Sequence, residues 1–137
     1  MKKTMILVAL CAAAIAGCGP KTPEAVAIKC IELTCQGDFE GVKKYMSKDA
    51  IKEQAAAEET TKKLFGAEAY EKHKKELVET MKKNTEGAKF EKKDVKIDGD
   101  KATVVVLVSK KGESKTKEIE VELVKEDGAW KVKDADL

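Results

Sequence analysis

Residues 102–108 read Ala-Thr-Val-Val-Val-Leu-Val, a run dominated by β-branched and aliphatic side chains. Such a run, bounded by turn signals, is typical of a strand that is covered on both faces. Asp98-Gly99-Asp100 precedes it and Lys111-Gly112 follows it, so we expect a turn at each end. In residues 118–123, Ile, Val and Leu alternate with glutamates, which predicts a second strand with one face in water.

Two further strands are expected beside this pair. Val95 and Ile97 share a face just before the first turn, and Trp130 and Val132 follow a third turn signal at Asp127-Gly128. The chain after Gly87 therefore predicts a four-stranded antiparallel meander.

The chain before Gly87 has helical periodicity. Thr22 is a predicted N-cap with Pro23 in the first turn, and Gly37 is the predicted end of that helix. Asp38 is a predicted cap for the next helix, and residues 48–86 continue the helical pattern with a break at Gly66. Two or three N-terminal helices packed on one face of the sheet give an α+β fold.

The start of the chain has the features of an export signal. Lys2 and Lys3 precede an apolar run at residues 5–16, which is too short to span a bilayer. Ile15-Ala16-Gly17-Cys18 resembles the bacterial lipobox. That resemblance implies cleavage between Gly17 and Cys18, with a diacylglycerol and an N-acyl chain attached covalently to Cys18 and no other cofactor. The alternative is an ordinary signal peptide in which Cys18 is incidental.

This reading divides the chain into a signal peptide at residues 1–17, a lipidated cysteine with a short tether at 18–22, and a single domain at 23–137. Even fully extended, the tether reaches only about 14 Å, which holds the domain close to the membrane. We expect a lipid-anchored protein of the cell envelope. Residue 19 is glycine, not the aspartate that favours inner-membrane retention in lipoproteins, so the outer membrane is expected where the organism has one.

Composition argues against one class of partner. Every one of the 27 basic residues is a lysine, and they are mixed with 25 acidic residues. Recognition of phosphates and base edges depends heavily on bidentate arginine, so no nucleic-acid partner is expected.

Cys30 and Cys35 lie on the first predicted helix. In a regular helix they point about 140° apart, and their Cα atoms are beyond the roughly 7 Å that a disulfide allows. We expect two separate thiols with Cys30 in the core; the alternative is a disulfide with the helix unwound before Cys35. The C-x4-C spacing with one distant histidine is a poor metal signature, so no metal is expected.

Several segments resemble one family, at both ends of the predicted domain. They are Pro23-Glu24-Ala25-Val26, Gly37-Asp38-Phe39-Glu40, Tyr45-Met46-Ser47, and the stretches 98–104 and 125–132. The family consists of small bacterial lipoproteins of unknown function whose fold is similar to nuclear transport factor 2, also called cystatin-like. The resemblance implies a curved sheet wrapped on helices, often leaving a conical pocket. Cys30-Ile31 departs from it, because relatives often carry an aromatic pair there.

Candidate site residues are few. In the wider superfold the pocket hosts isomerases and dehydratases that use buried Asp, Tyr or His. His73, the only histidine, is surrounded by lysines and is expected at the surface. Asp38, Tyr45 and Trp130 are candidates to line a pocket; their alternative roles are a helix cap, the edge of the core and core packing.

The sequence therefore predicts a non-catalytic envelope module that binds a protein partner or a small ligand near the membrane. One alternative is a small pocket enzyme of the isomerase or hydrolase type. The other is contact between lysines and anionic lipid head groups. The oligomeric state is not predicted.

Overall fold

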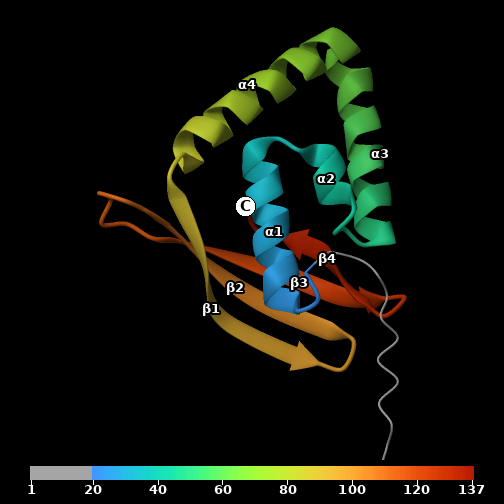
Figure 1. Ribbon diagram of the computed structural model, residues 1–137. Coiled ribbons are helices and arrows are strands. Elements are labelled where there is room, and N and C mark those ends of the chain that lie inside the picture. The colour runs from blue at the N-terminus through green and yellow to red at the C-terminus, as the bar shows by residue number, and fades with distance from the viewer. Residues whose placement is uncertain (1–19) are drawn as a thin grey trace, which may run out of the picture.

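The computed structural model describes residues 20–137, and in this part of the chain four helices precede four strands (Figure 1). The helices are α1 (Pro23–Gln36), α2 (Phe39–Lys43), α3 (Lys48–Phe65) and α4 (Ala67–Thr85). The strands are β1 (Ala88–Asp98), β2 (Lys101–Lys110), β3 (Lys117–Glu126) and β4 (Ala129–Ala135). They form one antiparallel sheet in the order β1-β2-β3-β4, with the helices on one face (Figure 1). The predicted α+β fold is confirmed.

The predicted signal peptide at residues 1–17, the cleavage after Gly17 and the lipidation of Cys18 lie outside the described residues. Within residues 20–137, the helices are each too short or too polar to cross a membrane.

Local sequence signals set the helix ends. The Thr22 hydroxyl accepts a hydrogen bond from the amide of Ala25 at 3.3 Å, which caps α1 as predicted. Gly37 ends α1 in the left-handed conformation, with φ 75°. The Asp38 carboxylate then accepts from the amide of Gly41 at 2.9 Å and caps α2. These two caps turn the chain sharply between α1 and α2.

Residues 48–86 form two helices, separated at Gly66 with φ 86°. Together with the short α2 this makes four helices in the described chain, where two or three were predicted. Neither long helix packs deeply: Ala50 is the one buried residue of α3, and none is buried in α4.

The link between α2 and α3 is tied to the sheet. Met46 forms a parallel bridge with Val132 of β4. The Ser47 amide donates to the Val132 carbonyl at 2.7 Å, and the Val132 amide donates to the Tyr45 carbonyl at 2.7 Å. The buried Ser47 hydroxyl accepts from the Ala50 amide at 3.1 Å and caps α3. This connection fixes where α3 begins.

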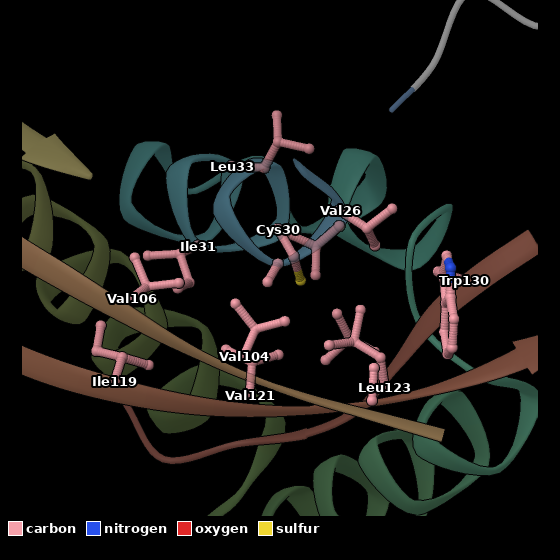
Figure 2. Close-up of a cluster of buried hydrophobic side chains, with 14 of the residues drawn as sticks. Val26, Cys30, Ile31, Leu33, Val104, Val106, Ile119, Val121, Leu123 and Trp130 are labelled. Carbon is pink, nitrogen blue, oxygen red and sulfur yellow. The ribbon is translucent and has the colours of Figure 1, made fainter. Parts of the chain in front are cut away.

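The core lies between α1 and the inward face of the sheet (Figure 2). Leu33 points away from the sheet, and Trp130 closes one end of the core. The side chains that meet across the interface are Val26, Cys30 and Ile31 of α1 with Val104, Val106, Ile119, Val121 and Leu123 of the sheet.

The prediction that β2 is covered on both faces is wrong for the described chain. Ala102, Val104 and Val106 are buried under α1, whereas Val105 and Leu107 on the opposite face are half-buried, and no described helix lies over them. Leu107 is opposite Glu118 of β3 and Glu91 of β1, so side chains of the flanking strands give it partial cover. A central strand can therefore be apolar on its outward face without a second layer.

Candidate functional site

A cavity of about 630 Å³ opens beyond the end of α1, between the sheet and α4. Its floor comes from the inward rows of three strands: Phe90 of β1 pairs with Val108 of β2, and Ile119 of β3 lies in the next inward pair, opposite Val106. Its roof comes from α4 and the start of α2 and includes Leu77, Met81 and Phe39. The lining is therefore mainly apolar.

The cavity follows from a difference in length between the helix and the sheet. α1 ends at Gln36, and β1, β2 and β3 extend past the end of the core that it covers. The next element over this part of the sheet is α4, whose residues are all partly exposed. Leu77, for example, keeps 48% of its surface exposed. The inward side chains of the strands are left with an open space above them.

Two threonine hydroxyls in the cavity wall are already hydrogen-bonded within their own helices. The Thr34 hydroxyl donates to the Cys30 carbonyl at 2.8 Å, and the Thr85 hydroxyl donates to the Met81 carbonyl at 2.7 Å. Because both hydroxyl groups donate their proton to helix carbonyls, the cavity wall offers a ligand mainly methyl and methylene groups.

The mouth of the cavity carries lysines. Alternation along β2 continues the inward row from Val108 to Lys110, and alternation along β3 puts Lys117 on the same face as Ile119. Lys115 of the connecting loop joins them, and Glu113 lies 3.8 Å from the Lys110 ammonium group. Three lysine side chains and one glutamate side chain thus join the apolar side chains of the lining.

Sequence reasoning missed these lysines, although a signal for them was present. Ile119, Val121 and Leu123 define the inward row of β3, and the same alternation carried two residues back reaches Lys117. A charged residue in the register of a buried row marks the place where that row leaves the core.

Cys35 lies in the cavity wall. Burial raises the pKa of the Cys35 thiol, and the neighbouring Thr85 side chain and the positive charge of Lys117 counteract part of that rise. Burial also raises the pKa of Cys30 to about 11, against a smaller opposing effect of the Thr34 side chain. Both thiols are free and α1 stays helical through Cys35, so the expected pair of separate thiols is confirmed. Both are neutral at physiological pH and are poor nucleophiles.

The sequence candidates for a pocket lie elsewhere. Asp38 is the cap of α2, and Tyr45 packs half-buried at the edge of the core. Trp130 is 8% exposed in the core, with the Lys125 ammonium group 5.2 Å from the centre of its ring. None of the three lines the large cavity, and His73 is exposed on α4 outside it.

A second, smaller cavity of about 400 Å³ lies between α1, α3 and β4. Thr34, Phe39 and Leu137 line both cavities. Over residues 20–137, histidine, cysteine and acidic side chains do not gather into a group of three that could hold a metal ion.

The geometry defines a small α+β domain in which helices cover one face of an open four-stranded antiparallel sheet and leave an apolar cavity at its end. Residues 46–137, about two thirds of the chain, match the family described as low molecular weight antigen MTB12, C-terminal domain, and the chain belongs to this family.

The matched segment runs from the link before α3 to the end of the chain, and it supplies all but three of the residues that line the cavity, the exceptions being Thr34, Cys35 and Phe39. A comparison with curated proteins finds no match. The family supports a small α+β domain. The lipoprotein family with a fold similar to nuclear transport factor 2, which the sequence motifs resemble, stays a prediction.

Proposed function

We propose that the chain is a membrane-anchored bacterial lipoprotein whose domain, similar in fold to nuclear transport factor 2, binds a small apolar ligand without transforming it. The observation that carries this proposal is the cavity between α4 and the sheet. Its volume of about 630 Å³ falls within the roughly 300–1,000 Å³ of small-molecule sites, and its lining is mainly apolar with a few polar groups at the mouth.

The side chains of the cavity favour binding over catalysis. In the described part of the chain, Glu113 is the one acidic side chain of the lining, and it is exposed and next to Lys110. The Cys35 thiol is neutral at physiological pH because its pKa is raised. An isomerase or hydrolase needs a positioned acid, base or nucleophile, and this lining supplies a solvated carboxylate and a weakly nucleophilic thiol.

An anchor at Cys18 would hold the domain at the N-terminal end of α1, whereas the cavity lies at the opposite end of this helix. The tether from Cys18 enters at Thr22, whereas Cys35 in the cavity wall is in the last turn of this 14-residue helix. The helix spans about 21 Å, so a domain held at its N-terminal end would direct the cavity mouth away from its own membrane. We infer that the module meets its ligand on the aqueous side and not in the bilayer that holds it.

Native mass spectrometry of the protein purified from its own cells tests the binding function. We expect a discrete small-molecule adduct that is released on unfolding. The proposal would be contradicted if the mass spectrum shows the protein without any adduct and the protein also fails to bind dodecan-1-ol in solution.

The anchor has its own test. Cys18→Ala should move the protein from the membrane fraction to the soluble fraction or leave an unprocessed precursor, and should remove the mass of the acyl chains. Unchanged membrane attachment of a processed chain would contradict lipidation at Cys18.

A further inference from the structure

We propose that the cavity selects an aliphatic chain with an anionic head group, with the chain over Phe90, Val108 and Ile119 and the head group between Lys115 and Lys117. This inference rests on the proposed binding function and names the class of ligand. A carboxylate and a phosphate monoester share the required chemistry.

The interior of the cavity suits a chain without polar atoms. Its floor has apolar side chains from three strands, and its roof adds Leu77, Met81 and Phe39. The Thr34 and Thr85 hydroxyls donate to backbone carbonyls within their own helices, so a polar ligand group would find few donors at this depth. Burial of each methylene contributes about 0.8 kcal/mol, which favours a long aliphatic chain here.

The mouth of the cavity suits an anion. Lys110 has a partner in Glu113, at 3.8 Å. Lys115 and Lys117 make no ion pair within 4.0 Å with any residue of the described chain. Lys117 also lies in the inward row of β3, directly after the apolar floor, and its charge acts on Cys35 inside the cavity. An ammonium group beside low-dielectric walls attracts an anion more strongly than one in open solvent.

The lysines at the mouth also predict which head groups bind weakly. A cationic head group would meet three lysines and one carboxylate that is already next to Lys110. A neutral head group would gain the burial of its chain but no charge pairing. The order of affinity expected for one chain length is therefore anionic, neutral, cationic.

Isothermal titration calorimetry on residues 20–137 tests this order. This segment contains every core residue and every helix cap of the described fold. The probes share a twelve-carbon chain and are dodecanoate, dodecyl phosphate, dodecan-1-ol and dodecyltrimethylammonium, each kept below its micelle concentration. We expect the two anions to bind on the order of tenfold more tightly than the alcohol, with an advantage that shrinks as salt rises. A preference between the two anions assigns the head group to a free acid or to a lipid phosphate.

Variants locate the head group. Lys115→Gln with Lys117→Gln should weaken dodecanoate binding on the order of tenfold and leave dodecan-1-ol binding unchanged. Glu113→Gln should tighten dodecanoate binding, because it frees Lys110. Lys96→Gln, on the outward row of β1, is the matched control and should change nothing.

The results distinguish an error in the ligand class from an error in the proposed binding function. Equal affinity for dodecanoate and dodecan-1-ol, or a double variant that binds dodecanoate normally, would overturn the ligand class while leaving a binding cavity. If neither probe binds to a protein with a normal circular dichroism spectrum, the proposed function itself is wrong.

Discussion

Lys117 lies opposite Val108 in the ladder between β2 and β3, so an ammonium group continues the row that Ile119 and Val121 form in the core. The two strands do not stop where the core stops. Their inward rows pass from buried aliphatic side chains, through the cavity floor, to lysines at the mouth. A single alternation thus produces both the hydrophobic core and the charged entrance of the proposed site.

Filling the cavity should abolish ligand binding without unfolding the domain. Val108→Trp puts an indole above the cavity floor, at a half-buried position with open space over it. We expect loss of dodecanoate binding by calorimetry and a change in unfolding free energy of about 1 kcal/mol or less. Val105→Trp, on the outward row of the same strand, is the matched control and should bind normally. Normal binding by Val108→Trp would place the ligand elsewhere.

Ser47→Ala should destabilise the domain by about 1–2 kcal/mol. The Ser47 hydroxyl is buried and accepts from the Ala50 amide at 3.1 Å, so its removal leaves that donor at the start of α3 without its partner. Urea unfolding followed by circular dichroism measures the effect. Ser114→Ala, in the exposed loop between β2 and β3, is the control and should leave the midpoint unchanged. Equal midpoints for the two variants would show that the cap does not limit stability.

Most of the fold was predictable because its signals are local. Thr22, Gly37 and Asp38 act through their own backbone geometry and hydrogen bonds, and the glycine turns at Gly99 and Gly128 have the positive φ that a tight hairpin requires. Alternation in β3 correctly separated buried from exposed residues. These features do not depend on distant parts of the chain.

The predictions that were wrong, and the features that were not predicted, depend on tertiary neighbours. Ile97 shares the inward face with Val95 as predicted, yet it is 58% exposed, because it lies on an edge strand beyond the core. The bridge between Met46 and Val132 joins segments 86 residues apart and has no local signal. The cavity exists because α1 ends before the sheet does, and the sequence gives element lengths but not their alignment.

Gly37→Ala should destabilise the domain by about 2 kcal/mol or more. Gly37 has φ 75°, and a Cβ there would lie 2.5 Å from Cγ1 of Val78 in α4. The left-handed conformation alone costs about 1–2 kcal/mol for a residue with a Cβ. Gly99→Ala is the control, since it has φ 58° and open space around the added carbon. Urea unfolding should show a larger loss for Gly37→Ala, and Val78→Ala in the same chain should reduce the difference. Equal losses of unfolding free energy in the two glycine variants would mean that α4 moves to accommodate the added Cβ without a cost in stability.

The free energy of unfolding should fall between pH 9 and pH 11 because the Cys30 thiol of the unfolded chain loses its proton in this range. Burial raises the pKa of its thiol from an ordinary 9.0 to about 11, so the folded state holds a proton that the unfolded state releases. The stabilising contribution is complete below pH 9 and is lost as the pH rises to about 11, a change of roughly 2–3 kcal/mol. Lysines titrate in the same range, so the comparison is with Cys30→Ala, whose unfolding free energy should decline less steeply. Parallel declines would show that the thiol is not the titrating group.

Dodecanoate should protect Cys35 from chemical modification. In residues 20–137 the cysteines are Cys30 and Cys35, so Cys30→Ala leaves one thiol, in the cavity wall. Methyl methanethiosulfonate is small and uncharged, so the lysines at the mouth neither attract nor repel it. With dodecanoate at ten times its dissociation constant, about one site in eleven is empty, and the modification rate should fall about tenfold. Dodecyltrimethylammonium at the same concentration should give little protection. If dodecanoate binds by calorimetry but the rate at Cys35 is unchanged, the chain of the ligand does not occupy this cavity, and the neighbouring one between α1, α3 and β4 becomes its site.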